Sequence, residues 1–319
     1  MRLLAQVCTR VRVRAGVAPD WLTPASRMPW PVTAPFHMRP NLEKLDPVAP
    51  ALLLRDELAD VYRRERALVI ATHAVRAMVG AANDAVLTAI RGLAPSPRAG
   101  EGWGEGAMAG TGQVDSASHP TPHPSPVLQG ERGRNAALVI QEDFVILKQD
   151  NDKLRTEYLS VCFPSRWDPR EKLGLDFAAI HAPVANNESL LAAGPNIMTM
   201  AFIKQPMLRH VWLVVPSASL DQHPEKNQAW WSETLADPSP LLPRLYFRIE
   251  RQTTWPLPHL QRAVFFIRVM MSPLADVLKV APGRACELAA SLRSMTPTIV
   301  AYRGMTEALP RLLNELDQI

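Results

Sequence analysis

The fold class is decided by two stretches, RLYFRIERQTTWPLP (residues 244–258) and AVFFIRVMMSPL (263–274). Both are rich in β-branched and aromatic residues, which is typical of strands. Three more stretches have the same character: RHVWLVVPS (209–217), LVIQEDFVIL (138–147) and TEYLSVCFPS (156–165). Their spacing lacks the long crossovers that parallel pairing needs. The sequence therefore predicts an antiparallel sheet.

Helices are predicted on both sides of this strand-rich region. Apolar residues recur at three- and four-residue spacings across 51–93, which indicates one long helix or two consecutive ones. The charged residues of 55–65, including Asp56, read as a solvated face. A helical turn within 168–184 precedes the other predicted helices, which cover 186–204, 273–278, 284–295 and 306–317. The predicted fold class is α+β, a sheet with flanking N- and C-terminal helices.

Composition divides the chain into four parts. Residues 1–50 are a proline-rich, basic lead-in that we expect to be partly disordered, and 51–95 form the helical part of the main domain. Residues 96–133 are rich in Gly, Pro and Ser, so we expect a disordered low-complexity insertion there. Residues 134–319 form the main α+β domain.

Charge and cysteine content exclude several classes of protein. The 319 residues carry a formal net charge of +4, which the leader arginines Arg2, Arg10, Arg12 and Arg14 supply by themselves. The rest of the chain is therefore nearly neutral, and nucleic-acid binding is not expected. The three cysteines have no metal-ligand spacing, and no run of about 18 apolar residues occurs. We expect a cytoplasmic protein with no membrane partner.

The usual nucleotide and hydrolase motifs are missing from the sequence. It contains neither G-x-G-x-x-G after a strand nor G-x-x-x-x-G-K-[ST], and neither G-x-S-x-G nor H-E-x-x-H. The chain therefore lacks the common cradles for dinucleotides and triphosphates.

One histidine stands in a segment suited to ligand binding. In FPSRWDPREKLGLDFAAIHAPV (163–184), the apolar residues 178–180 precede His181, and Arg166 and Trp167 lie upstream. An imidazole on an apolar wall suits the axial position of a haem iron. The alternative is a core histidine satisfied by a backbone carbonyl.

A second candidate is the strand that contains Arg248 and Arg251. On a regular strand Arg248, Glu250 and Gln252 share one face, and Arg251 lies on the other. Guanidinium groups bind carboxylates such as haem propionates in a bidentate manner. The alternative is a set of salt bridges on the two faces of the strand.

Taken together, three runs resemble the haem-dependent oxidative N-demethylase family, α-subunit type. These are the segment 163–184, the strands RIERQTTWPLP and AVFFIRVMMSPL, and the closing AYRGM (301–305). The resemblance covers about 138–317, with weaker support across 51–93. It implies a PAS-like haem-binding domain that uses O2 to convert a small secondary amine such as dimethylamine to a primary amine and formaldehyde.

The resemblance also implies cofactors and site residues. Haem b would be bound by this chain, with His181 as the metal ligand and Arg166, Trp167, Arg248 and Arg251 as pocket or propionate residues. Of the two strand arginines we expect Arg251 to meet a propionate. Electrons would come from a separate NADPH-dependent reductase subunit with flavin and iron–sulfur centres, and a folate-binding subunit would capture formaldehyde.

The chain departs from the family pattern in two motifs. Residues 183–186 read Pro-Val-Ala-Asn where the family continues Pro-Val-Pro-Gly, and 209–212 read Arg-His-Val-Trp where Arg-x-Asn-Trp is typical. His210 is an alternative ligand. Two other functions are compatible with the sequence: a haem-based PAS-like sensor or binding protein without turnover, and a degenerate family member without cofactor.

Overall fold

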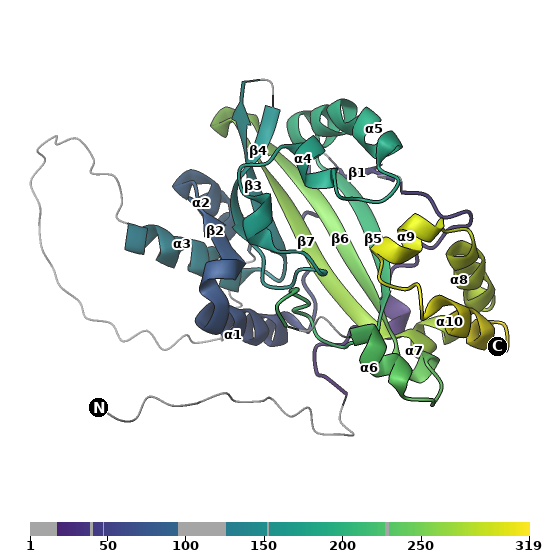
Figure 1. The fold of residues 1–319 in the computed structure, drawn as a ribbon. Coiled ribbons are helices and arrows are strands. Elements are labelled where there is room, and N and C mark those ends of the chain that lie inside the picture. Colours follow the sequence, from purple (N-terminus) through teal and green to yellow (C-terminus); the bar gives the residue numbers. More distant parts are fainter. Residues whose placement is uncertain (1–17, 39–40, 47, 95–125, 152, 227–229) are drawn as a thin grey trace, which may run out of the picture.

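An antiparallel sheet of seven strands forms the centre of the protein (Figure 1). The computed structural model describes residues 18–38, 41–46, 48–94, 126–151, 153–226 and 230–319. The strand order is β1-β5-β6-β7-β3-β4-β2. The strands are β1 (Glu43–Lys44), β2 (Met78–Gly80), β3 (Asp143–Asp150), β4 (Lys153–Ser160), β5 (Met207–Val215), β6 (Tyr246–Leu257) and β7 (Arg262–Pro273).

The two stretches that decide the fold class form the central hairpin, β6 and β7. These strands pair along their whole length, from Tyr246 opposite Pro273 to Leu257 opposite Arg262. Gln261 in the turn has a φ of 52°, in the left-handed region. The predicted α+β class, with an antiparallel sheet and flanking helices, is confirmed.

Several strand boundaries differ from the prediction. The stretch 138–147 was expected to be a strand throughout, but β3 begins at Asp143, because residues up to Val139 belong to helix α3. Ala136 and Ala137 of that helix are fully buried, so tertiary packing outweighs the local preference for strand. Strand β4 begins at Lys153, earlier than predicted.

Helices cover the two ends of the sheet. Figure 1 shows α1, α2 and α3 beside β2, β3 and β4, and α8, α9 and α10 on the opposite side beyond β5. The α-helices are α1 (Ala59–Ala77), α2 (Asp84–Leu93), α3 (Pro126–Val139), α4 (Phe177–His181), α5 (Glu188–Thr199), α6 (Trp230–Ala236), α7 (Leu274–Lys279), α8 (Arg284–Arg293), α9 (Pro297–Tyr302) and α10 (Leu309–Leu316). A π-helix, η3 (Met200–Lys204), continues α5. Together they account for the helix predicted over 186–204.

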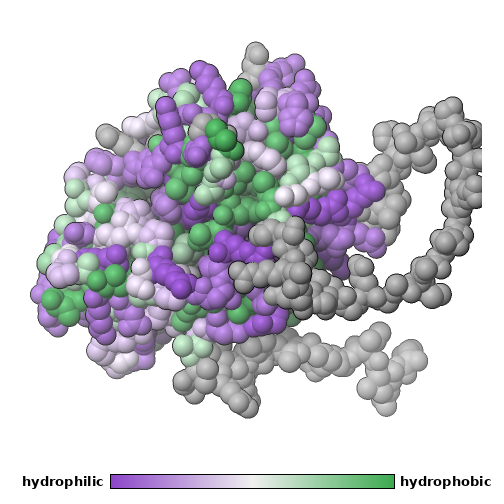
Figure 2. Space-filling view, turned by 180° about the vertical axis from the view of Figure 1, so that it is seen from behind, coloured by the Kyte–Doolittle hydropathy of each residue, from purple (hydrophilic) through white to green (hydrophobic). Residues whose placement is uncertain are grey.

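Two separate apolar clusters hold these helices against the sheet. Tyr62 of α1 and Leu87 of α2 pack with Phe144 and Phe266, all of them fully buried. At the other end, buried leucines of α7, α8 and α10 pack against Phe247 of β6. Figure 2 shows hydrophobic residues also reaching the centre of the face seen from behind, with hydrophilic residues around them.

The predicted lead-in and insertion are partly folded. Met28 and Val32 are buried against the β5–β6 end, and the Thr23 amide donates to the Met271 carbonyl at 2.7 Å. Helix α3 begins at Pro126 and so occupies the end of the expected insertion 96–133. Residues 1–17 and 95–125 lie outside the described part of the chain.

No helix within the described ranges is both long and apolar enough to cross a membrane.

Candidate functional site

A cavity of about 680 Å³ lies between one face of the sheet and helices α4, α5 and η3. Its walls come from β3, β4, β5, β6 and β7, from these helices, and from the segments 31–42 and 302–305. Sites for cofactors and small molecules typically measure about 300–1,000 Å³. The cavity is therefore large enough for a cofactor and a small ligand.

Most of the cavity wall is apolar. The sheet contributes residues that alternate with buried core residues on the other face, because successive side chains on a strand point to opposite faces. Bulky side chains of the covering helices complete this wall. The apolar lining includes Val145, Leu159, Phe265, Ile267, Phe177, Leu190, Ile197 and Phe202. Such a lining excludes water and strengthens any polar interaction made inside it.

His181 is held at the end of α4 with one ring nitrogen occupied. Asp176 caps this helix, because its carboxylate accepts from the Ala179 amide at 3.0 Å. The four-residue spacing then places His181 Nδ1 2.8 Å from the Phe177 carbonyl. A carbonyl only accepts, so we assign the proton to Nδ1. Nε2 keeps its lone pair, and it has no hydrogen-bond partner among the described residues.

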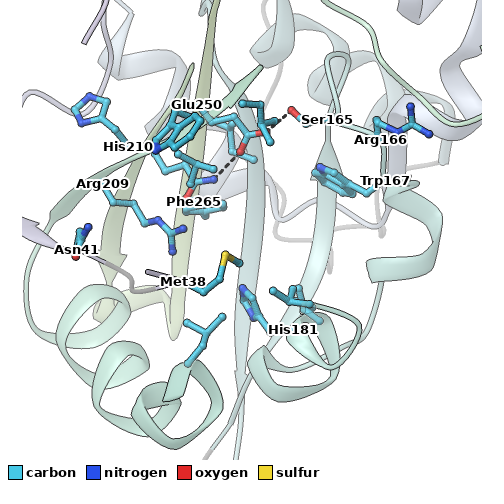
Figure 3. A pocket seen from close by; sticks show the side chains of 18 of the residues that line it. Met38, Asn41, Ser165, Arg166, Trp167, His181, Arg209, His210, Glu250 and Phe265 are labelled. Carbon is cyan, nitrogen blue, oxygen red and sulfur yellow. Dashed lines mark hydrogen bonds between the residues drawn. The ribbon is translucent and has the colours of Figure 1, made fainter. Parts of the chain in front are cut away.

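The surroundings of His181 favour its neutral form. Burial lowers the pKa of the imidazole, and the nearby cations Arg209 and Lys172 lower it further, against the opposing effect of the Phe177 carbonyl. The ring also lies against Phe177, with centroids 4.1 Å apart. Figure 3 shows it pointing into the cavity. A neutral imidazole with its second nitrogen bound to a carbonyl is the usual state of a metal-ligating histidine.

Trp167 and Arg166 have different orientations at the cavity. Trp167 is half-buried and packs, like Phe265, against the buried cluster of Val145, Leu159 and Val161. Arg166 is exposed and has a φ of 63°, and its amide donates to the Gln222 carbonyl at 3.0 Å. In Figure 3 the indole points toward the cavity and the Arg166 side chain points away from it. Both residues line the cavity, but only Trp167 presents its ring to the interior.

A chain of hydrogen bonds forms the polar part of the wall. Ser165 Oγ donates to Glu250 Oε1, and Gln252 Nε2 donates to Oε2 of the same carboxylate at 2.7 Å. Arg248 Nε donates to Ser165 Oγ at 2.8 Å. Figure 3 shows Ser165 directed toward Glu250. The carboxylate is thus fixed at both oxygens beside the cavity.

Arg248 and Arg251 do not meet in the cavity. Arg248 is fully buried behind Ser165, where its guanidinium also donates to the carbonyls of Phe163 (2.8 Å) and Leu220 (3.0 Å). Arg251 lies on the other face of β6, and its guanidinium donates to the carbonyls of Ala51 and Leu52. Neither is among the lining residues, so both arginines hold neighbouring segments against the sheet.

His210 is the nearest alternative to His181. It stands opposite Arg251 in the β5–β6 register and so belongs to the face of the sheet opposite Glu250. Figure 3 shows its ring pointing away from His181. His181 has one ring nitrogen held by a carbonyl and presents the other to the cavity, so it is the stronger candidate ligand.

Arg209, to which we assigned no role from the sequence, is the most unusual group in the cavity. Its guanidinium points inward (Figure 3) and makes no hydrogen bond or ion pair with the described residues. Nε is fully buried, and burial lowers the pKa of this arginine. The sequence shows that a cation stands at position 209. Only the tertiary structure shows that this cation has no partner among the described residues.

A further cation, Arg303 of the AYRGM segment, is placed by aromatic rings. Its guanidinium carbon lies 4.6 Å from the ring centroid of Phe36 and 4.8 Å from that of Trp212. Burial lowers its pKa to about 10. The cation–π contacts and a 3.2 Å hydrogen bond to the Trp212 carbonyl stabilise this cation, which has no acidic partner among the described residues.

The two departures from the family pattern have separate surroundings. Val211 lines the cavity and stands opposite Glu250 in the strand register, so an apolar side chain lies beside the carboxylate where the resemblance leads us to expect an amide. Asn186 has a φ of 52°, and its side-chain oxygen accepts from the Thr296 hydroxyl at 2.9 Å. The first change alters the cavity itself, and the second lies in a loop contact.

The fold and cavity define a class: an α+β protein in which an antiparallel sheet walls a cofactor-sized cavity, into which His181 presents a ring nitrogen without a hydrogen-bond partner among the described residues. A family model, described as haem-dependent oxidative N-demethylase, alpha subunit-like, matches residues 118–313. The chain belongs to this family. The family name implies dependence on haem and the presence of partner subunits. No curated protein matches the chain significantly.

Proposed function

We propose that this chain is the haem b subunit of an oxidative N-demethylase and that His181 is the axial ligand. The observation that carries the proposal is the state of the His181 ring. Its Nδ1 is bound to the Phe177 carbonyl, its pKa is lowered by burial, and Nε2 is free at the wall of the 680 Å³ cavity. Haem needs a neutral imidazole on an apolar wall, and these residues fit that need.

Other residues of the cavity have supporting roles in this proposal. The indole of Trp167 and the rings of Phe177 and Phe265 offer apolar surface for the porphyrin. Arg166, at the exposed rim, is the sequence-predicted cation that we assign to a propionate. We assign Arg248 and Arg251 no contact with the cofactor in this proposal, because their guanidinium groups donate to backbone carbonyls.

The proposed reaction removes a methyl group from a small secondary amine. Bound haem supplies the binding and activation of O2. The overall change is R–NH–CH3 + O2 + NADPH + H⁺ → R–NH2 + HCHO + NADP⁺ + H2O. The C–N bond breaks, one oxygen atom enters formaldehyde and the other enters water. The apolar lining keeps bulk water from the reacting centre.

The electrons must come from outside this chain. The sequence lacks the common dinucleotide motifs, which supports a separate NADPH-dependent reductase with flavin and iron–sulfur centres. A folate-binding subunit that captures formaldehyde fits the same scheme. The alpha-subunit description of the family supports such partners. We place the assembly in the cytoplasm.

The test is formaldehyde release by the haem-loaded full-length chain. With NADPH, a flavin and iron–sulfur reductase, and either dimethylamine or N-methylglycine, we expect formaldehyde in proportion to NADPH consumed. Omission of the reductase should abolish it. Haem-linked spectral changes on adding amine or O2, without formaldehyde from any N-methylated amine, would contradict the proposal and favour a sensor.

A further inference from the structure

Two opposite charges lie side by side in the cavity without pairing. In the β5–β6 register Arg209 stands opposite Gln252 and Val211 stands opposite Glu250. Arg209 and Glu250 are therefore diagonal neighbours on the same face, a separation of about 7–8 Å between such Cα atoms. No ion pair joins them. The cavity thus presents a cation and an anion next to each other.

Arg209, the cation of this pair, has no partner among the described residues. Arg209 makes no hydrogen bond or ion pair with a residue in the described ranges, and its Nε is buried. Glu250 is near enough to raise the pKa of Arg209, although burial lowers it more strongly. A buried charge without a partner is costly to the folded protein. This cost indicates that an anionic group of a ligand completes the site.

The anion is already positioned to receive a cation. Glu250 is only 8% exposed, and Ser165 and Gln252 each donate to one of its oxygens. Arg248 orients Ser165 from behind and does not reach the carboxylate itself. A carboxylate has about four acceptor sites, so Glu250 retains lone pairs for an ammonium group.

We propose that the cavity binds a zwitterionic N-methylated amino acid, with its carboxylate on Arg209 and its ammonium group on Glu250. This inference rests on the proposed function for the reaction, but it names the substrate class. Two charges at adjacent positions match the short distance between the ammonium and carboxylate groups of an α-amino acid. Dimethylamine has no carboxylate and would leave Arg209 without a partner.

A haem propionate fits the neighbouring charges of Arg209 and Glu250 less well than an amino acid does. It would bring a second carboxylate beside Glu250 with no cation of its own, and like charges at this separation repel each other in a low-dielectric cavity. The ammonium group of an amino acid removes that repulsion. The geometry therefore favours a substrate carboxylate at Arg209.

Calorimetric titration of the full-length chain, haem-loaded and haem-free, provides the test. The probes are N-methylglycine, dimethylamine and acetate. N-Methylglycine should bind at least about tenfold more tightly than dimethylamine or acetate. Arg209→Gln should remove that advantage and leave dimethylamine binding unchanged, and Arg209→Lys should restore part of it. Glu250→Gln should weaken both amines.

Lys172→Gln is the matched control, because Lys172 is another cavity-lining cation. It should retain the preference for N-methylglycine, and melting temperatures should show that each variant is folded. Equal affinity of the wild-type protein for N-methylglycine and dimethylamine would overturn the inference. So would an Arg209→Gln variant that loses haem affinity but keeps the preference. A preference for N-methylglycine in a protein that never binds haem would support this site and contradict only the proposed function.

Discussion

His181→Ala is expected to reduce haem affinity by about 100-fold or more. Changes to groups that merely orient a metal-bound histidine cost about 10- to 100-fold in metal affinity, so removal of the ligand should cost at least that. In the wild-type protein Nδ1 lies 2.8 Å from the Phe177 carbonyl, which leaves Nε2 as the atom that we propose binds the iron. The alanine variant has no nitrogen there. Haem titration followed by absorption measures the loss, and added imidazole should restore a histidine-like spectrum.

His210→Ala is the control for this change. His210 also lines the cavity, but it belongs to the sheet face that carries Arg251. This variant should keep wild-type haem affinity and spectrum. Retention of haem by His181→Ala together with its loss in His210→Ala would reverse the assignment of the ligand.

Asp143→Ala is expected to lower the free energy of unfolding by about 3–5 kcal/mol, because it leaves a buried cation without its partner. Asp143 accepts from Arg66 Nη1 at 2.7 Å, and the side chains are 1% and 0% exposed. Its carboxylate also accepts from the amides of Cys162 and Phe163 at 2.8 and 2.9 Å. The pair thus joins α1 to the segment that leads into the cavity. Chemical denaturation measures the effect.

An exposed ion pair offers the matched comparison. Arg293 and Asp317 form a salt bridge in which both side chains are about half-exposed. Asp317→Ala should change the free energy of unfolding by about 0–1 kcal/mol, because solvent screens such pairs. A loss of stability no larger in Asp143→Ala than in Asp317→Ala would contradict the role given to the buried pair.

The strands were predictable because side-chain patterning and composition carry their signal locally. Residues 244–258 and 263–274 are rich in β-branched and aromatic residues, and they form the central hairpin. The start of β3 was not predictable in this way. Residues 138–139 favour a strand by type, but burial of the neighbouring Ala136 and Ala137 keeps them helical.

Part of the site was predictable, and part required the tertiary structure. Alternation correctly separates Arg248 and Glu250 from Arg251, but a two-residue period cannot reveal which face borders a cavity. In the structure the Arg251 guanidinium donates to the Leu52 carbonyl, a partner that the strand pattern does not show.

Charge patterns on the first helical region were similarly ambiguous. Asp56 was predicted to lie on a solvated face, but its carboxylate accepts from the buried Arg268 at 2.9 Å, and its side chain is only 16% exposed. A charged residue next to other charged residues usually lies in solvent. A partner more than two hundred residues away in sequence is not visible in a local pattern.

The most direct measurement of the central claim is a haem titration of the purified full-length chain, followed through the Soret band. The account predicts saturation at one haem per chain, with the spectrum of histidine-ligated haem b. A titration in which the spectrum stays that of free haem, with no saturable site, would contradict it.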